Sequence, residues 1–236
     1  MTGKPIKLAR NDRFDADTML LVFIHVPKSG GTSFHAGLTT IGRGGYLLLE
    51  PGSNNPPDID LLWGAGGHIG FEHGLVARSR KDRVYVTLVR DPLDRFVSFY
   101  KHVQQGPHHL RRMNRALVGM EPLLFAKALV DIGDTEISNL QCRMISGRDG
   151  ATAETTLEII ERHYSICVPI SRQQEALDAI AGMAGHPPIE TQRLNTSSQE
   201  IPVEITPELV AFIEEVNSED RKLFDAVSAP DWKGLP

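Results

Sequence analysis

The feature that most constrains the fold is an apolar run at residues 19–26, which stops at a proline and leads into a glycine-rich turn. Its length and its content of branched residues predict a buried strand. The turn reads Pro-Lys-Ser-Gly-Gly-Thr-Ser over residues 27–33, and its last two residues indicate the beginning of a helix. Glycines let backbone N–H groups point inward, and a helix N-terminus adds positive potential. This unit therefore predicts a site for a phosphate or sulfate group.

The lysine of this turn precedes the glycines, which excludes the Walker A loop, where a lysine follows them. Lys28 supplies a mobile positive charge, and Thr32 and Ser33 supply hydroxyl donors. The turn resembles the 5′-phosphosulfate loop of sulfotransferases that use 3′-phosphoadenosine 5′-phosphosulfate (PAPS). It is most similar to the carbohydrate 2-O branch, the heparan type included, whose loop reads His-x-Pro-Lys-[Ser/Thr]-Gly-Gly-Thr-Ser. The alternative is a strand-to-helix turn that uses glycine only for its geometry.

A second strand-to-helix junction follows later in the chain. The continuous β-prone run at residues 84–89 predicts a buried parallel strand. Pro92 suits the first turn of the next helix, and Asp91 is placed to cap that helix. Asp94 lies in the same first turn, where a negative charge is favourable. The junction therefore predicts a second carboxyl end of a strand that leads directly into a helix.

The family that the first loop resembles binds the 3′-phosphate with an arginine that leaves such a strand and a serine on the next helix. The resemblance assigns these two roles to Arg90 and Ser98. Arginine suits the role because its planar fork can bind two phosphate oxygens. The alternative is a surface junction in which Arg90 pairs with Asp94. Over both motifs, the residues expected to bind PAPS are Lys28, Ser29, Gly30, Gly31, Thr32, Ser33, Arg90 and Ser98.

Weaker similarity continues towards the C-terminus. Residues 139–147 resemble a family helix that reads Asn-Leu-Gln-x-Arg-x-[Leu/Ile]-Ser-Gly, and residues 164–168 predict another buried strand. Relatives carry Gly-Leu-x-Glu-Arg after that strand, whereas residues 168–172 read Val-Pro-Ile-Ser-Arg and lack the glutamate. Residues 192–198 resemble a polar loop that closes over the nucleotide. An amphipathic pattern at residues 209–224 predicts one or two final helices.

The order of these elements predicts the fold class. Buried strands at residues 19–26, 84–89 and 164–168 alternate with helical stretches, and shorter strands are expected at residues 46–49 and 67–69. This order favours an α/β protein with a P-loop-like, three-layer α/β/α arrangement and a central, mainly parallel sheet. Phosphate loops belong at the carboxyl ends of such strands, where both motifs fall. We expect one sulfotransferase domain over residues 1–236.

Composition and charge exclude several other classes. The net charge of −5 argues against a general surface for polyanions, and no nucleic-acid module is recognisable. No apolar run approaches the roughly 20 residues that span a bilayer. The polar start of the chain, together with the resemblance, favours a cytoplasmic, bacterial-type member of the family. The two cysteines, Cys142 and Cys167, form no zinc or disulfide pattern, and no metal site is expected.

A cluster of basic residues follows the second motif. It fits either recognition of an anionic acceptor, such as a uronic acid sugar, or a solvated basic loop. Glycine- and proline-rich loops at residues 42–45, 50–58 and 106–112 are candidates for shaping an acceptor pocket. The sequence determines neither the acceptor nor the oligomeric state. The cluster comprises Lys101, His102, His108, His109, Arg111, Arg112 and Arg115.

Sulfuryl transfer to a hydroxyl also needs a base with a pKa near the working pH, which favours histidine or glutamate. Residues 66–71 resemble the Gly-His-[Val/Ile] segment that carries a catalytic histidine in the 2-O branch, which makes His68 the expected base. Glu72 and His73 are the alternatives. Relatives often have a second histidine at the place of Gly66, so a paired-histidine mechanism is not expected. His25, beside the loop, is expected to pack structurally or to contact substrate.

The function expected from the resemblance is transfer of the sulfuryl group of PAPS to an acceptor hydroxyl, on a carbohydrate or glycoconjugate, without a metal. Lys28 is expected to stabilise the leaving group. Two other functions stay open. A nucleotide-dependent phosphotransferase would need magnesium ligands, for which the segment at residues 89–91 is the nearest candidate. A binding protein of the same fold that lacks catalysis would explain the missing glutamate and the missing second histidine.

Overall fold

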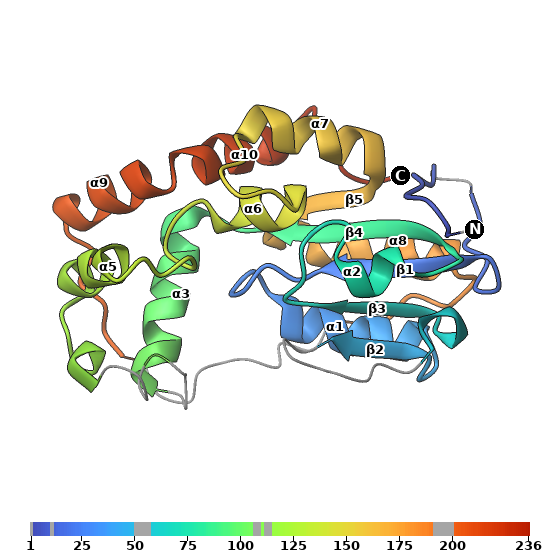
Figure 1. Ribbon diagram of the computed structural model, residues 1–236, viewed down its shortest axis with the longest axis horizontal. Coiled ribbons are helices and arrows are strands. Elements are labelled where there is room, and N and C mark those ends of the chain that lie inside the picture. Colours follow the sequence, from blue (N-terminus) through green and yellow to red (C-terminus); the bar gives the residue numbers. More distant parts are fainter. Residues whose placement is uncertain (1, 10–11, 50–57, 106–109, 111–114, 191–200) are drawn as a thin grey trace.

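Five parallel strands form the centre of the molecule in the order β2-β3-β1-β4-β5 (Figure 1). The computed structural model describes residues 2–9, 12–49, 58–105, 110, 115–190 and 201–236. Since every pair of neighbouring strands is parallel, the carboxyl ends of all five lie at one edge of the sheet. The strands are β1 (Met19–Ile24), β2 (Tyr46–Leu49), β3 (Gly64–Gly67), β4 (Asp82–Val89) and β5 (Tyr164–Pro169).

Helices cover both faces of this sheet. On one face, α1 (Gly31–Ile41) and α8 (Gln173–Met183) pack against alternate side chains of β1, β4 and β5. The other face carries α2 (Gly74–Ala77), α6 (Leu140–Ser146), α7 (Ala153–His163) and α10 (Ser218–Ser228). Strands buried on both faces need apolar residues at most positions, and the few buried polar side chains, such as Thr87 and Ser165, form hydrogen bonds. The expected three-layer α/β/α fold is confirmed.

A third apolar cluster lies beyond the carboxyl edge of the sheet. It is formed by α3 (Pro92–Gln105), α5 (Pro122–Asp131) and α9 (Pro207–Val216), which gather to the left of the sheet in Figure 1. Helix α3 therefore leaves the end of β4 and extends away from the sheet, so its first turns border the carboxyl edge. Three single-turn 3₁₀ helices complete the described elements: η1 (Ile59–Leu61), η2 (Arg115–Leu117) and η3 (Ile170–Arg172).

The start of α3 follows the predicted capping pattern. The helix begins at Pro92, and the Asp91 carboxylate accepts a hydrogen bond from the Asp94 N–H at 3.0 Å. Proline at this position loses no helical hydrogen bond, because the first N–H groups of a helix have no partner within it. The prediction of an Asp91-capped helix directly after β4 is confirmed.

The short strand expected at residues 67–69 was misplaced. Strand β3 comprises Gly64–Gly67, so His68 follows the strand instead of lying inside it. A run of glycines argues against a strand by propensity, but close packing requires it here. A Cβ on Gly67 would lie 2.0 Å from the carbonyl oxygen of Leu49 on the neighbouring strand. Similarly, β1 ends at Ile24, two residues earlier than expected.

Some expectations concern residues outside the described ones. These are the polar loop at residues 192–198, the loop residues 50–57, and much of the basic cluster, namely His108, His109, Arg111 and Arg112. None of the helices in the described part of the chain combines the length and the apolar character that crossing a bilayer requires.

Candidate functional site

The loop between β1 and α1 has the backbone geometry of an anion site. Lys28 has a φ of 67° and Gly30 a φ of 81°, so the loop turns twice through the left-handed region before α1 begins at Gly31. The N-terminus of α1 has no side-chain cap and no acidic residue in its first turn. The Ser29 hydroxyl is buried and has no hydrogen-bond partner among the described residues. Unpaired donors at a helix N-terminus suit a phosphate or sulfate oxygen.

The two sequence motifs meet at this loop. Arg90, at the end of β4, donates a hydrogen bond from Nη1 to the main-chain carbonyl of Lys28 at 2.9 Å. Burial and the nearby Arg90 charge lower the pKa of Lys28, and burial lowers the pKa of Arg90. Neither side chain forms an ion pair with a carboxylate in the described part of the chain, including the Asp94 pair considered above. The charges of Glu136 near Lys28 and of Asp91 and Asp94 near Arg90 act only from a distance, so two partly buried cations without a direct ion pair favour an anionic ligand.

The main chain of Arg90 is fixed by a residue for which the sequence predicted no role. The Gln141 side chain accepts a hydrogen bond from the Arg90 N–H at 2.8 Å and donates one to the Arg90 carbonyl at 2.8 Å. Gln141 itself is fully buried on α6. These two bonds hold the end of β4 in place, so the glutamine of the Asn-Leu-Gln motif positions the arginine of the second motif.

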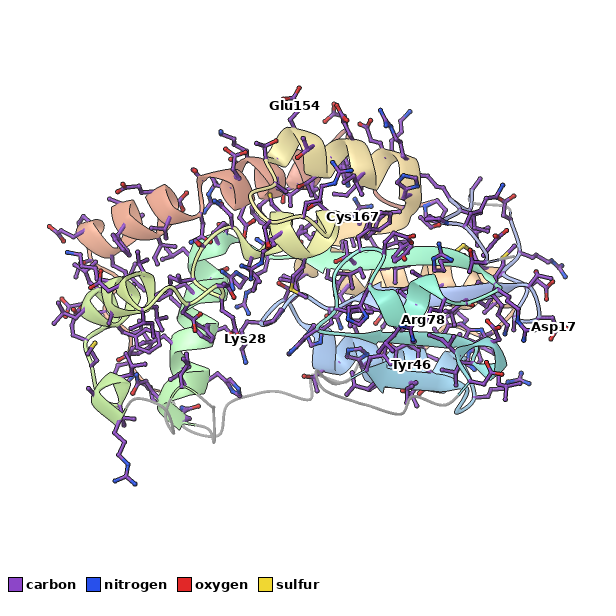
Figure 2. All side chains as sticks on the ribbon, in the orientation of Figure 1. Asp17, Lys28, Tyr46, Arg78, Glu154 and Cys167 are labelled. Carbon is purple, nitrogen blue, oxygen red and sulfur yellow. The ribbon has the colours of Figure 1, made fainter. Side chains whose placement is uncertain are left out.

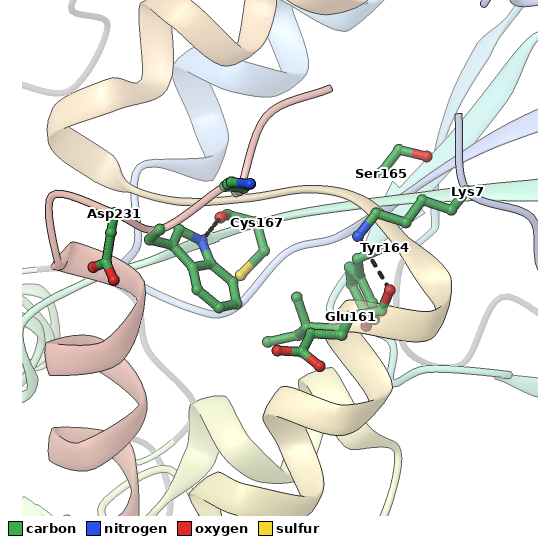
Figure 3. Close-up of a pocket in the computed structure, with 10 residues that line it drawn as sticks. Lys7, Glu161, Tyr164, Ser165, Cys167 and Asp231 are labelled. Carbon is green, nitrogen blue, oxygen red and sulfur yellow. Dashed lines mark hydrogen bonds between the residues drawn. The ribbon is translucent and has the colours of Figure 1, made fainter. Parts of the chain in front are cut away.

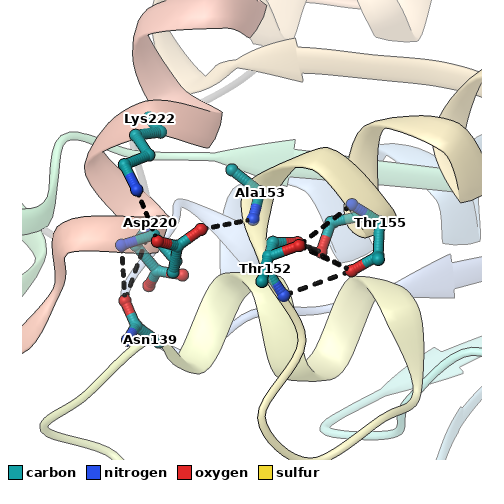
Figure 4. A network of polar contacts seen from close by, with 8 residues as sticks. Asn139, Thr152, Ala153, Thr155, Asp220 and Lys222 are labelled. Carbon is teal, nitrogen blue, oxygen red and sulfur yellow. Dashed lines mark hydrogen bonds and ion pairs between the residues drawn. The ribbon is translucent and has the colours of Figure 1, made fainter.

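Helix α6 and helix α10 cap each other (Figure 4). The buried Asp220 carboxylate accepts hydrogen bonds from the Gln141 N–H at 3.0 Å and the Cys142 N–H at 2.8 Å. In return, the Asn139 side chain accepts from the N–H groups of Glu219 and Asp220 at 3.0 and 3.1 Å. Each helix thus satisfies the unpaired N–H groups of the other. This exchange fixes Gln141, and through it Arg90, to the rest of the fold.

A buried arginine lies next to this capping pair. Arg95 on α3 is 1% exposed, and its Nη2 donates to the Glu136 carbonyl at 2.9 Å, while its Nε and Nη1 have no partner in the described structure. Burial lowers the pKa of Arg95 and raises the pKa of Asp220, and each charge favours the ionised form of the other. Asp220 therefore has two structural tasks: it caps α6 and it compensates the Arg95 charge.

Ser98 lies on the face of α3 that is directed towards the phosphate loop. Residues 94, 98 and 102 are four apart and so share one face of the helix. Burial and then the charge of Lys28 lower the pKa of His102. Lys28 therefore lies near this face of the helix. Figure 2 shows Lys28 between the sheet and α3. The fold thus brings half-buried Ser98 to the same side of the site as Arg90 and Lys28.

His68 is exposed and lies directly after β3, on the other side of the phosphate loop. Partial desolvation of the ring by its neighbours, followed by the Lys28 charge, lowers its pKa below the ordinary value of 6.5. Its ring centroid is 4.6 Å from that of His25. The main-chain N–H of His25 donates a hydrogen bond to the Gly67 carbonyl at 3.0 Å, which joins the ends of β1 and β3. A neutral imidazole at this position is able to accept a proton.

The two alternative bases have structural partners. Glu72 forms an ion pair with buried Arg83 at 3.1 Å and accepts a hydrogen bond from the Tyr85 hydroxyl at 2.7 Å. His73 caps α2, because its Nδ1 accepts from the Leu75 N–H at 3.4 Å. Both groups hold the segment that follows His68, which leaves His68 as the histidine of this segment that is exposed towards the loop.

The divergent junction after β5 also borders the phosphate loop. A Cβ on Gly30 would lie 2.6 Å from the Ile170 side chain and 2.9 Å from the Gln173 side-chain oxygen. Gly30 is therefore required for its positive φ and for this close approach. Arg172 pairs with Glu175 at 2.9 Å on the surface of α8. The junction without the family glutamate thus packs against the loop through an isoleucine.

A cavity of about 330 Å³ lies elsewhere, beside β5 (Figure 3). The C-terminal segment lines it, with the Trp232 Nε1–H donating to the Cys167 carbonyl at 2.8 Å. Burial raises the pKa of the Cys167 thiol, which makes it a poor nucleophile. The cavity contains none of the residues of the two motifs, so we place the candidate site at the phosphate loop. Over the described residues, no group of three or more His, Cys, Asp or Glu side chains is arranged to hold a metal ion.

Comparison with known proteins agrees with this location. Residues 11–121, slightly less than half of the chain, match the family model described as "Sulfotransferase family". The matched part contains the phosphate loop, His68, Arg90 and Ser98, and it confirms the predicted class of enzyme, a sulfotransferase, for this part of the chain.

A search of solved structures gave a more distant likeness. The crystal structure of mouse sulfotransferase SULT7A1 complexed with PAP is 15% identical, with a TM-score of 0.43, over 94% of this chain and 79% of that chain. No curated protein sequence matches this one significantly.

Proposed function

We propose that this protein transfers the sulfuryl group of PAPS to a hydroxyl group of a carbohydrate or glycoconjugate. The observation that carries the proposal is the Arg90–Lys28 contact of 2.9 Å, which joins two motifs 62 residues apart at the uncapped N-terminus of α1. A nucleotide with a 3′-phosphate and a 5′-phosphosulfate needs two groups of hydrogen-bond donors, one for each anionic group. The family match over residues 11–121 includes both of them.

The residues present fit the nucleotide. The 5′-phosphosulfate would lie over the N-terminus of α1, where Ser29, Gly30, Gly31, Thr32 and Ser33 supply backbone N–H and hydroxyl donors. The buried and unpartnered Ser29 hydroxyl is the observation that supports this part most directly. Arg90 and Ser98 would bind the 3′-phosphate. The cationic charge of Lys28 and Arg90 would compensate an anion that is otherwise costly to bury.

The chemistry assigned to these residues is an in-line displacement at sulfur. The acceptor oxygen forms a bond to sulfur while the bond from sulfur to the 5′-phosphate oxygen breaks, and 3′-phosphoadenosine 5′-phosphate (PAP) leaves. His68 takes the proton of the acceptor hydroxyl, and Lys28 stabilises the negative charge that develops on the leaving oxygen. The lowered pKa of His68 supports this role, since the ring is then neutral at neutral pH. The assignment to the carbohydrate 2-O branch, to a cytoplasmic enzyme and to a single domain stays a prediction from the resemblance.

The direct test is turnover. The purified protein is incubated with PAPS and a panel of uronic-acid-bearing, neutral and amino sugars, and sulfated products are detected by mass spectrometry. Formation of a sulfated sugar and PAP in equal amounts, without added metal, is the expected result. Magnesium-dependent consumption of ATP would instead indicate a phosphotransferase. Tight binding of PAPS without turnover of any acceptor would indicate a binding protein of the same fold.

A further inference from the structure

A chain of aromatic side chains leads from β2 to the phosphate loop. The Tyr46 hydroxyl lies 2.6 Å from Nδ1 of His35, and Nε2 of His35 lies 3.2 Å from Nδ1 of His25. The His25 ring then contacts that of His68, with 4.6 Å between the centroids. These four residues come from β2, α1, the end of β1 and the end of β3. The fold alone brings them together, and the proposed function above assigns a role only to the last of them.

The hydrogen bonds of this chain have a direction. Tyr46 is 9% exposed, and its hydroxyl has one hydrogen-bond partner among the described residues, His35 Nδ1. A buried O–H without an acceptor is unfavourable, so the Tyr46 hydroxyl donates to His35 Nδ1. A neutral His35 then carries its proton on Nε2 and donates it to Nδ1 of His25. A neutral His25 therefore carries its own proton on Nε2.

Two glycines allow this arrangement. A Cβ on Gly66 would lie 2.3 Å from the Tyr46 hydroxyl, and a Cβ on Gly31 would lie 1.9 Å from Nε2 of His25. Gly66 is the position at which the 2-O branch often has a second histidine, and here the Tyr46 hydroxyl packs against it. Gly31 is the first residue of α1, so Nε2 of His25 faces the N-terminus at which the anion site lies.

We propose that His25 is a positioning residue, held by Tyr46 and His35 as a neutral imidazole with its proton on Nε2. This proposal rests on the proposed function. The uncharged ring packs against His68 without placing a positive charge beside the base, and its Nε2–H points to the phosphate loop as a hydrogen-bond donor. Protonation of His25 at Nδ1 would place an N–H group of His25 opposite the Nε2–H group of His35. The hydrogen bonds from Tyr46 and His35 therefore disfavour this protonation.

The charges around His25 act in the same sense. Burial lowers the pKa of His25 to about 2, with contributions from His68, His35 and Lys28. Burial also lowers the pKa of His35 to about 4, with a contribution from His68. The groups that face His25 are thus His35 from α1, His68 from the end of β3 and Lys28 from the loop, and Tyr46 faces His35 from β2. All of them favour the neutral form.

The first test reads the tautomers directly and needs no turnover. Protein labelled with ¹⁵N-histidine, free of nucleotide and at neutral pH, is examined by two-bond ¹H–¹⁵N correlation spectra, with His25→Gln and His35→Gln providing the assignments. The expected result is a neutral Nε2–H tautomer for both histidines. A protonated His25, or a His25 with its proton on Nδ1, would overturn the proposal. This outcome is independent of the identity of the substrate.

The second test removes the first donor of the chain. Tyr46→Phe keeps the ring but lets His35 carry its proton on Nδ1, so that His25 gains a proton acceptor in His35 Nε2. We expect the Nε2–H tautomer of His25 to be lost and the KM for PAPS to rise, because the donor that this tautomer directs to the phosphate loop is lost with it. The control is Tyr164→Phe, which deletes the hydroxyl of another buried tyrosine, one that donates to the Ile145 carbonyl at 2.7 Å.

The two readouts separate this proposal from the proposed function. Unchanged tautomers and an unchanged KM for PAPS in Tyr46→Phe, or the same changes in Tyr164→Phe, would overturn the role of the chain. If no acceptor is turned over, the proposed function fails, and the tautomers of His25 in the parent protein and in Tyr46→Phe still decide whether the Tyr46–His35 pair fixes this imidazole.

Discussion

The guanidinium of Arg90 donates a hydrogen bond to the main-chain carbonyl of Lys28 at 2.9 Å, so it is fixed to the backbone of the other cationic residue of the site. Burial lowers the pKa of both side chains, and each is left without an ion pair in the described part of the chain. Two like charges held together in a half-buried place are unfavourable for the free protein. They become favourable when an anion with several negative charges binds between them.

Lys28→Ala tests the stabilisation of the leaving group. Removing one preorganised donor to a developing negative charge typically lowers kcat by about 10²–10³-fold. Lys28 lies on a loop and is only half-buried, so the free energy of unfolding is expected to change little. Steady-state kinetics and urea unfolding measure the two effects. Lys222→Ala, which removes a surface lysine paired with Glu219, serves as the control, and near-normal kcat in Lys28→Ala would contradict the assigned role.

His68→Ala tests the base. General base catalysis contributes about 10²–10⁴-fold, and kcat is expected to fall by this range while the fold is kept, since His68 is exposed. Partial desolvation by its neighbours and the Lys28 charge lower the pKa of His68, so activity of the parent protein should persist below the ordinary histidine pKa of 6.5 before it declines. His73→Ala, the matched control on the same segment, should keep both rate and profile. Equal losses in the two variants would contradict the choice of His68.

Asp220→Ala tests the exchange of caps between α6 and α10. The substitution leaves the N–H groups of Gln141 and Cys142 without acceptors and removes the carboxylate that most favours the buried Arg95 charge, so that Glu136 alone remains to favour it. Breaking a buried charge pair in this way typically costs about 3–5 kcal/mol of unfolding free energy. Asp220→Asn keeps an acceptor and should lose less. Urea unfolding measures both, and an Asp220→Ala variant as stable as the parent would contradict this account.

The buried histidines predict how stability depends on pH. The pKa values of His25 and His35 are lowered by burial to about 2 and about 4, while both return to about 6.5 on unfolding. Between these values the unfolded chain binds more protons than the folded one. The free energy of unfolding therefore has its full contribution from these two neutral histidines above pH 6.5. Below pH 6.5 this contribution is lost as the pH falls, by at most about 1.4 kcal/mol per pH unit for each histidine.

Urea unfolding between pH 6.5 and 5 tests this dependence, because most carboxylates stay ionised in that range. His35→Gln should reduce the slope of unfolding free energy against pH. His186→Gln, which changes a histidine that is only half-buried near the end of α8, should leave the slope unchanged. An equal slope in the parent protein and in His35→Gln would mean that the buried imidazole does not titrate as described.

The sequence predicted the elements whose signals are local. The apolar runs of β1, β4 and β5 are buried on both faces of a parallel sheet, so each is continuous and recognisable. The caps of α3 and the loop before α1 likewise depend on neighbours in sequence, such as Asp91 and Pro92. Because parallel strands bring their carboxyl ends to one edge, the convergence of Lys28 and Arg90 also followed from the order of elements.

Other features depend on contacts that no local pattern encodes. Strand β3 was misplaced, because its glycines serve the close approach of Leu49 and Tyr46, which becomes visible only when the strands are paired. The hydrogen bonds between Gln141 and the main chain of Arg90 join residues 51 positions apart in the sequence. The His25–His35–Tyr46 chain joins three elements. The motif around Gln141 was visible in the sequence, but its task was not, since a glutamine has no fixed partner in a sequence pattern.

The most direct test of the central claim is the thermal stability of the protein with PAP, compared with AMP and with ATP plus magnesium. Ligand at 100 times its Kd stabilises the native state by about 2.7 kcal/mol, which corresponds to a shift of roughly 5–10 °C for a chain of this size. We predict this shift for PAP and a much smaller one for AMP in the parent protein, and in Arg90→Ala a loss of most of that difference. A larger shift with magnesium ATP, or equal shifts with PAP and AMP, would contradict the account.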